Sequence, residues 1–387
     1  AGASDNPFAP PREEPFPLPA FPPSYSDALL ADACESLGIA THSVPNARNS
    51  TPHAGRSECV GYGTCQPVCP SGAKYDATAT MSDAEAAGAR VVDRATVRRL
   101  EHGGAGERVT AAVYATPSGA TRHQEAAEFV LAAGGVETPR LLLLSASPQH
   151  PDGLANASGL VGRYFTDHVY AGVEGVLDRR TRQHHVGFQT TNSHQFYDQP
   201  ADGSRTAIKL EFHNTAGPTP ADVALSGDAL GDDLLADVRA EYGGHVGVGA
   251  LVEQVPRRGD RVRLHPSETD AHGDPVPDVV WSLADRTRRT VERANEIQRS
   301  ILDELGADVR RVAGPERAGP AAHHMGTTRM GDDPAGSVVG RDLRAHDVAN
   351  LTVAGSSVFP TTGAMNPTLT IAALALYAAD RLRERLA

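Results

Sequence analysis

The chain has 387 residues, which is long enough for two domains. Of these residues 40% are hydrophobic and 22% are charged, a composition that is ordinary for a globular protein. Its 48 acidic residues outnumber its 36 basic ones, giving a formal net charge of −12. This balance argues against nucleic acid as a partner, because phosphate binding requires clustered cations. No apolar run approaches the roughly 20 residues of a membrane-spanning helix, which suits a cytoplasmic protein or one held at a membrane by a partner.

Lys74 and Lys209 are the only lysines, and every other basic residue is arginine. A GC-rich genome explains this bias, and so does adaptation to salt, where an acidic surface keeps a protein soluble. The sequence opens with AGASDNPFAP, which has neither an initiator methionine nor a signal-peptide pattern. We therefore expect a cut or processed start.

Residues 1–74 are predicted to form a proline-rich arm over 1–24, a short helix over 26–38 and a cysteine-rich loop. Residues 75–150 follow with three strands within 90–135, separated by the turns HGGAGE and PSGAT. The last strand, FVLAAGG, is expected to be central, buried and in contact with a ligand at its carboxyl end. A helix should begin directly after it, with Pro139 near its first turn.

Residues 151–322 are predicted to form a domain with an antiparallel sheet, with strands between 169 and 283. The polar stretch 217–233 is poorly patterned and is expected to be a loop. Residues 285–307 have the apolar spacing of an amphipathic helix that ends at Gly306.

Residues 323–387 contain a histidine pair in a glycine-rich loop, a strand within 350–360 and a long closing helix over 366–386. This helix is apolar along most of its length, so we expect it to be buried. Its N-terminus offers unpaired N–H groups that suit an electron-rich oxygen. The simpler alternative is a core helix for which Asn366 is only the N-cap.

Four segments, in order, resemble the signatures of the glucose–methanol–choline (GMC) oxidoreductases. They are AAGGVETPRLLLLS (132–145), NASGLVGRYFTDH (156–168), HHMGTTRMG (323–331) and NLTVAGSSVFP with GAMNPTLT (350–370). The resemblance covers nearly the whole chain. It implies an FAD-dependent enzyme that oxidises the hydroxyl of a sugar or polyol by passing hydride to the flavin N5 atom.

The resemblance also implies roles for individual residues. His323 matches the histidine that takes the hydroxyl proton, which suits the pKa of imidazole near 6.5. Asn366 matches the second catalytic position, while His324 is expected to be structural. Many members have Asp at the position of Gly355, and sugar-oxidising branches also carry Gly. The residues expected around the cofactor are Val97, Ala133, Gly134, Gly355, Asn366, Pro367 and Thr368.

Cys59, Cys65 and Cys69 lie in CVGYGTCQPVCP, a loop for which a disulfide, a zinc ion and an iron–sulfur cluster are all candidates. The motif resembles the GMC branch of bacterial glucose, fructose, sorbitol and gluconate dehydrogenases. That likeness implies a three-iron (3Fe-4S) cluster that passes electrons to a cytochrome or small-subunit partner, with oxygen a poor acceptor. Cys34 is expected to be buried in its helix.

The strand–GxGxxG–helix unit that binds the pyrophosphate of FAD is not found in the sequence. GGAGERV (103–109) and GVGALV (247–252) both lack the third glycine. The predicted fold is therefore mixed α/β, with an incomplete Rossmann-like FAD domain and a substrate domain. The chain is then either a truncated product, or a separate chain completes the FAD site. Two rival functions stay open, a pyranose-type oxidase that uses oxygen and a non-catalytic remnant.

Overall fold

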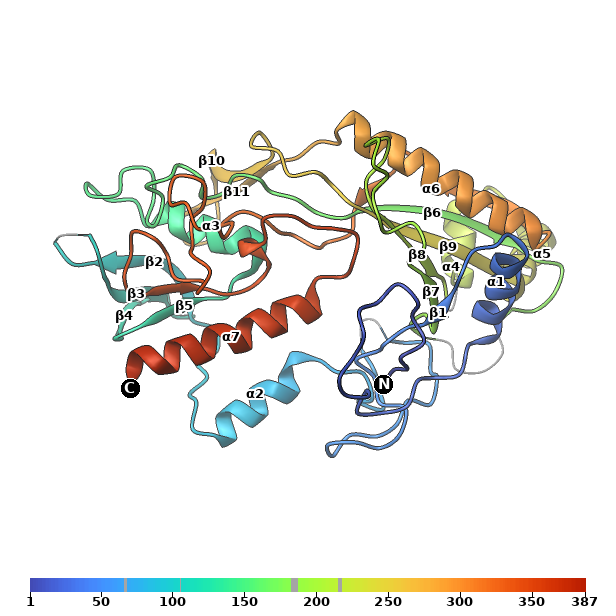
Figure 1. Ribbon diagram of the computed structural model, residues 1–387, viewed down its shortest axis with the longest axis horizontal. Helices are drawn as coiled ribbons and strands as arrows, with labels where there is room; N and C mark the ends of the chain where they lie inside the picture. The colour runs from blue at the N-terminus through green and yellow to red at the C-terminus, as the bar shows by residue number, and fades with distance from the viewer. Residues whose placement is uncertain (66–67, 105, 182–186, 215–217) are drawn as a thin grey trace. The chain divides into compact units, whose positions relative to one another are not determined.

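The computed structural model describes residues 1–65, 68–104, 106–181, 187–214 and 218–387. The chain forms two compact units, each assembled from three separate stretches (Figure 1). The first unit contains Ala1–Arg90, Val169–Val252 and Asp285–Gly319. The second contains Val91–His168, Glu253–Ala284 and Pro320–Ala387. The division of the chain into a cofactor-binding part and a substrate-binding part, expected from the sequence, stays a prediction.

The first unit is built on an antiparallel sheet with the strand order β1-β7-β8-β9-β6-β12. These strands are β1 (His42–Ser43), β6 (Val169–Val176), β7 (Thr191–Ser193), β8 (Ile208–Phe212), β9 (His245–Val252) and β12 (Asp308–Ala313). The unit's helices are α1 (Tyr25–Ser36), α2 (Ala77–Ala86), α4 (Pro220–Ser226), α5 (Gly231–Gly244) and α6 (Asp285–Glu304). The two-residue strand β13 (Gly319–Pro320) lies where the chain passes from the first unit to the second.

The long helix α6 covers one face of this sheet. Its apolar side chains Val291, Ile297 and Ile301 are buried at the 3.6-residue spacing that the sequence predicted. On the same face of the sheet, alternate residues of β6 such as Val169 and Val173 are fully buried. The opposite face carries polar side chains, so the two faces of this sheet differ sharply in character.

The described part of the second unit combines three small sheets with two α-helices and one short 3-10 helix. β2 (Thr96–His102), β3 (Val109–Ala115) and β4 (Thr121–Glu125) form an antiparallel sheet. β10 (Arg261–Thr269) and β11 (Pro275–Val280) form a hairpin. β5 (Phe129–Leu131) and β14 (Leu351–Val353) pair in parallel, and α3 (Gly134–Leu144), the short helix η1 (Ser356–Val358) and α7 (Thr368–Leu386) complete the unit.

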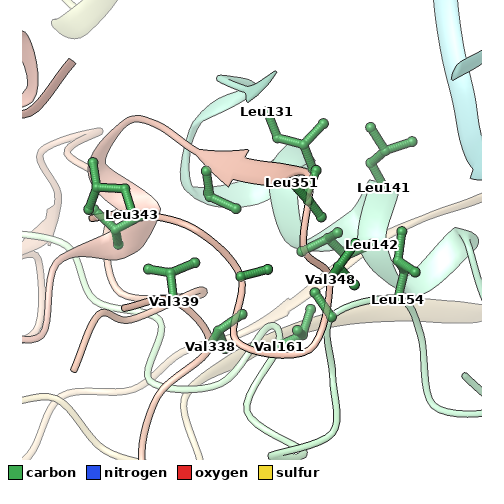
Figure 2. Packing of buried hydrophobic residues seen from close by; sticks show 14 of the residues in the cluster. Leu131, Leu141, Leu142, Leu154, Val161, Val338, Val339, Leu343, Val348 and Leu351 are labelled. Carbon is green, nitrogen blue, oxygen red and sulfur yellow. The ribbon is translucent and has the colours of Figure 1, made fainter. Parts of the chain in front are cut away.

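The core of the second unit brings distant parts of the sequence together. Leu131 of β5, Leu141 and Leu142 of α3, and Leu351 of β14 belong to the buried cluster that Figure 2 shows. Ile371 and Leu374 of α7 pack against the same cluster. This core therefore holds β5, β14, the end of α3 and the first turns of α7 in one body.

The observed architecture confirms the predicted mixed α/β class with an antiparallel sheet. Three local expectations are wrong. The stretch around 217–233 contains α4 and the start of α5 instead of only a loop, and α4 begins with a capping box in which Thr219 and Asp222 bond reciprocally. FVLAAGG supplies only the three-residue strand β5, and its middle residue Val130 is 47% exposed.

Helix α7 is only partly buried. One face of the helix packs on the core, but Leu369 is 80% exposed and Leu376 is 71% exposed. Within the described parts of the second unit no element covers these side chains, so the expected burial of the whole helix does not occur. None of the helices in the described ranges is both long enough and apolar enough to cross a membrane.

Candidate functional site

Two backbone segments of the second unit pair with each other and set the register of the candidate site. The amide of Thr166 donates to the carbonyl of Met325 at 3.0 Å, and the amide of Met325 donates to the carbonyl of Thr166 at 2.8 Å. The amide of Ala321 donates to the carbonyl of His168 at 2.9 Å. The pairing brings Asp167 and His168 beside His323.

The rings of His168 and His323 meet edge to face. Their Nδ1 atoms lie 2.8 Å apart, and the ring planes make an angle of 84°. The Nε2 atom of His168 is 3.3 Å from the carbonyl oxygen of Thr362. A carbonyl oxygen only accepts, so this contact places a hydrogen on Nε2 of His168, and the Nδ1 atom of the neutral ring is then an acceptor.

The tautomer of His168 determines that of His323. Because Nδ1 of His168 accepts, Nδ1 of His323 must carry the hydrogen of their shared bond. In a neutral imidazole the other nitrogen, Nε2 of His323, then has the lone pair. His168 is fully buried while His323 is half-buried, so His168 acts as the fixed partner. This arrangement prepares His323 to accept a proton at Nε2.

The carboxylate of Asp167 anchors the same loop by binding the backbone amide of His323 and not its ring. Its Oδ1 atom accepts from the amide of His323 at 2.8 Å, and its Oδ2 atom lies 3.6 Å from Nε2 of His324. Burial raises the pKa of the Asp167 carboxyl, and the hydrogen bond from the His323 amide and the charge of His324 oppose this rise. The side chain of His324 thus interacts with Asp167, away from the His168–His323 pair.

Two residues with positive φ shape the loop on either side of the histidines. Ala322 has φ of 61°, an unusual conformation for a residue other than glycine, and it directly precedes His323. Gly326 has φ of 92°, and a Cβ atom there would lie 2.2 Å from the carbonyl oxygen of Tyr164. Only glycine satisfies both constraints at position 326, which explains the glycine of the HHMG sequence.

The start of α3 approaches this loop very closely. A Cβ atom at Gly135 would lie 2.6 Å from the carbonyl oxygen of His324, so a larger residue would displace the loop. Thr327 donates through Oγ1 to the carbonyl of Gly135 at 2.8 Å, and Ser356 donates through Oγ to the carbonyl of His324 at 2.6 Å. The histidine loop is therefore clamped between the beginnings of α3 and η1.

Three of the predicted cofactor residues meet at one edge of the β5–β14 pair. Because these strands are parallel and Val353 lies opposite Leu131, their carboxyl ends coincide. Ala133 and Gly134 follow β5, and Gly355 follows β14. Gly355 has φ of 111°, and no atom lies within 4 Å of the position that a Cβ would take. The backbone conformation accounts for glycine at this position, where an Asp would be strained.

The remaining predicted residues are spread over the second unit. Val97 lies on β2 and is 42% exposed. Pro367 is the N-cap of α7, and Thr368 is its first residue, with no side-chain capping bond. Asn366 stands just before them and is exposed. Because Pro367 is the N-cap, Asn366 is not the N-cap that the simpler interpretation required. Asp167, His168 and Gly135 complete the site and were not singled out by sequence analysis.

The cysteine triplet lies in the first unit. All four cysteines are within the described ranges and are free thiols, so none is in a disulfide. Cys59, Cys65 and Cys69 are half-buried, and Cys34 is fully buried as predicted. Burial raises the pKa of Cys69, but hydrogen bonds from the Lys74 amide and from Ser71 outweigh it, and the net shift is downward. N–H groups directed at a thiolate are typical of cysteines that bind a metal or a cluster.

Comparisons with known proteins identify the family of the chain. Residues 22–170 match the N-terminal model of the GMC oxidoreductases, and residues 256–375 match the C-terminal model. The chain is 33% identical to the fructose dehydrogenase large subunit of Gluconobacter japonicus over 373 residues, covering 96% of this chain and 68% of that one. It is 31% identical to the paromamine 6'-oxidase of Streptomyces fradiae over 374 residues, covering 93% of this chain and 65% of that one.

A solved structure shares the fold. The pyridoxine 4-oxidase of Mesorbium loti superposes with a TM-score of 0.64 at 20% identity, covering 95% of this chain and 72% of that one. The chain thus spans about two thirds of the length of the curated relatives named above. Both family models match in order, and a relative of more than 30% identity aligns over almost the whole chain. The chain belongs to the GMC oxidoreductase family.

Proposed function

We propose that this protein oxidises a hydroxyl of a sugar or polyol to a carbonyl group, with FAD as the hydride acceptor. The observation that carries the proposal is the His168–His323 pair, in which the contact with the carbonyl of Thr362 leaves Nε2 of His323 as a proton acceptor. The name of the fructose dehydrogenase relative supports a sugar-type substrate. His323 is the catalytic residue in this proposal, and His168 is a positioning residue.

The proton moves to Nε2 of His323. Loss of the hydroxyl proton leaves an alkoxide character on the substrate oxygen, which makes departure of the neighbouring C–H hydrogen as hydride easier. His323 becomes an imidazolium whose Nδ1–H is already donated to His168. The developing charge is thus stabilised by a bond that exists before the reaction, at no cost in reorganisation. Asn366 is proposed to orient the substrate hydroxyl with its amide.

The residues at the carboxyl ends of β5 and β14 fit a dinucleotide cofactor. Ala133, Gly134 and Gly355 present backbone without bulky side chains, and the space beside Gly355 is open. We propose that they contact the ribityl and nucleotide parts of FAD, with Pro367 and Thr368 at the start of α7 and Val97 near the adenine. When bound, FAD would supply the two-electron acceptor for the hydride. Residues 75–150 and 323–387 would together form this FAD-binding part, and 151–322 the substrate part.

The FAD site would be completed by polypeptide that carries the pyrophosphate-binding motif. The exposed face of α7, with Leu369 and Leu376, and the exposed Val130 of β5 are apolar surface beside the proposed cofactor residues. A GxGxxG unit on an N-terminal segment or on a separate chain is the proposed cover for this surface.

Cys59, Cys65 and Cys69 are proposed to hold a 3Fe-4S cluster, which would supply a one-electron acceptor for the electrons of the flavin. A small-subunit or cytochrome partner would accept them in turn, in line with the description of the fructose dehydrogenase relative as a large subunit. The runner-up is an oxidase, which the relative named as an oxidase favours. In that case reduced flavin would react directly with oxygen.

A visible spectrum of the purified, FAD-loaded enzyme tests these functions together. The proposal predicts flavin bands over a broad brown absorption, and bleaching of the flavin bands by fructose or glucose under anaerobic conditions. Flavin bands without iron, together with rapid hydrogen peroxide formation, would favour the oxidase. A protein that stays colourless after incubation with FAD and the completing segment would contradict both enzyme functions.

A further inference from the structure

The polar face of the sheet in the first unit contains a cluster of three potential metal ligands. Glu174 lies on β6, His213 follows β8 directly, and His245 begins β9. Each offers one ligand atom, and these atoms all lie within 4.8 Å of one another. We propose that Glu174, His213 and His245 form a binding site for a divalent transition-metal ion of the zinc type, a site that goes beyond the proposed oxidation.

The register of the sheet creates this cluster. Glu174 lies opposite Gly247 of the central strand β9, and the amide of His213 donates to the carbonyl of Gly247 at 2.9 Å. His213, Gly247 and Glu174 therefore form one row across three strands. His245 lies two residues before Gly247 on the same face of β9, since side chains alternate along a strand.

The glycine in the middle of the row lets its neighbours approach each other. A Cβ atom at Gly247 would lie 2.5 Å from Nδ1 of His213 and 3.3 Å from Cγ of Glu174. Without that atom, the imidazole and the carboxylate lean over β9, and Nδ1 of His213 comes to 3.7 Å from Oε1 of Glu174. A glycine at position 247 thus makes the room that an ion between these two side chains would need.

The distances suit a tetrahedral ion after small side-chain movements. Bonds of about 2.0–2.1 Å in a tetrahedral site place the ligand atoms roughly 3.3 Å apart. The separation of 3.7 Å between His213 and Glu174 is close to this value, and the limit of 4.8 Å leaves at most about 1.5 Å to be closed by side-chain rotation. Two imidazoles and one carboxylate form a known zinc set that leaves a fourth position for water.

Tyr170 orients the ring of His213, as hydrogen-bond partners commonly orient histidines that bind a metal. The hydroxyl of Tyr170 lies 2.6 Å from Nε2 of His213, the ring nitrogen remote from Glu174. When Nδ1 binds an ion, Nε2 carries the hydrogen and donates it to this hydroxyl, which fixes the tautomer and the ring plane. The nitrogen ligands also select against magnesium and calcium, which prefer oxygen.

One charged neighbour of the cluster opposes cation binding in a way that can be measured. Arg311 approaches Oε2 of Glu174 at 3.6 Å and also bonds Glu241 at 2.9 Å. Its charge competes with a cation for Glu174. Lys209 and Glu211, both on β8, form an ion pair, so their opposite charges nearly cancel. Removing the Arg311 charge should therefore strengthen metal binding.

The decisive experiment titrates the full chain, without a polyhistidine tag and after removal of metal by a chelator, with Zn²⁺ by calorimetry and with Co²⁺ by visible spectroscopy. Glu174→Gln and His245→Ala should each weaken one binding event by more than the roughly 10–100-fold that loss of an outer partner costs. Tyr170→Phe should weaken it within that range of about 10–100-fold, and Arg311→Gln should strengthen it. His123→Ala and Glu304→Gln serve as matched surface controls and should change nothing.

The cobalt spectrum separates this site from the cysteine triplet. Binding at Glu174, His213 and His245 predicts tetrahedral d–d bands without a thiolate-to-cobalt charge-transfer band in the near ultraviolet. Glu174→Gln preserves the shape of a half-exposed side chain, so it tests the site even where a histidine variant fails to fold. Unchanged affinity in Glu174→Gln, or cobalt bands that carry only thiolate character, would overturn the proposal.

Discussion

The Nδ1 atoms of His168 and His323 share a hydrogen bond of 2.8 Å, and the direction of that bond is set outside the pair, at the carbonyl oxygen of Thr362. A backbone carbonyl cannot change its role from acceptor to donor. It therefore fixes the tautomer of His168, which in turn fixes that of His323. The reactive nitrogen is selected by a chain of three groups, in which His168 belongs to the stretch Val91–His168, and His323 and Thr362 belong to Pro320–Ala387.

The His168 partner can be tested by two substitutions of different shape. His168→Ala removes the acceptor, so the ring of His323 can rotate or change tautomer, and substrate oxidation should slow by about 10–100-fold. His168→Asn places an amide oxygen near the former Nδ1 and should restore part of the rate. Steady-state rates with sugar, measured across pH, check both variants.

The pH profile distinguishes positioning from a general structural effect. The imidazolium form of His323 is stabilised by His168, so its loss should move the acid side of the pH–rate profile of His168→Ala to lower pH. His168→Asn should move it less. A profile that only scales down, with no movement along the pH axis, would show that His168 supports folding rather than the base.

A stability prediction concerns Asp270, which anchors α3. Burial raises the pKa of Asp270, but hydrogen bonds from Arg140 and from the amides of His272 and Asp274 outweigh it and lower the pKa to about 2. A depressed pKa in the folded state stabilises the fold above the ordinary range near 4, and this contribution is lost as pH falls toward 2. A quarter of the side chain is exposed, so solvent screening limits the contribution to about 1–2 kcal/mol.

Asp270→Asn should accordingly lower the free energy of unfolding by this amount at pH 7, and by progressively less toward pH 3. Trp281, the single tryptophan, lies in the same unit and reports unfolding in urea by its fluorescence. The exposed Asp228→Asn is the control and should show no such trend. A constant difference between wild type and Asp270→Asn at all pH values would contradict the ion-pair account.

The cysteine triplet is tested by Cys65→Ser. The proposed cluster should be lost, and with it iron, acid-labile sulfide and reduction of an artificial electron acceptor. Reduction of the flavin by sugar should stay largely intact, since the cluster acts after that step. Cys34→Ser is the control, because the buried Cys34 lies outside the triplet. Iron content that does not change in Cys65→Ser would remove the cluster and the one-electron path with it.

The two faces of α7 should respond differently to polar substitutions. Leu369 and Leu376 are exposed, so replacing both with Gln should cost little stability, within about 0.5 kcal/mol each, while reducing aggregation of the isolated chain. Leu374 packs on the core, and Leu374→Gln should cost about 2 kcal/mol. Light scattering after size-exclusion chromatography measures the association. An isolated wild-type chain that is already monodisperse would contradict the idea that this face is normally covered.

Sequence patterns predicted the elements whose burial is periodic. Helix α6 and strands β6, β8 and β9 lie within the expected stretches, because their apolar residues alternate or recur every turn. Helices α4 and α5 were missed because their surfaces are polar, and their first turns depend on local capping and acidic residues instead. The exposed face of α7 was missed because an apolar sequence predicts burial without specifying what buries it.

The site was only partly predictable for a related reason. His323 and the glycines of the cofactor edge were assigned through the family resemblance, which records motifs along the chain. His168 lies in the recognised stretch NASGLVGRYFTDH, but its role depends on pairing with a segment about 155 residues away. The Glu174–His213–His245 cluster depends on sheet register and on the missing side chain of Gly247, neither of which is visible as spacing.

We propose that His323, and not His324, is the base. Anaerobic stopped-flow reduction of the flavin by sugar in the FAD-loaded enzyme measures it most directly, with Asn366→Ala as an intermediate case. A general base contributes typically about 10²–10⁴-fold, so His323→Ala should slow flavin reduction by that factor while FAD content is retained. His324→Ala should lose far less, because its ring faces Asp167. Normal reduction in His323→Ala together with a dead His324→Ala enzyme would contradict the account.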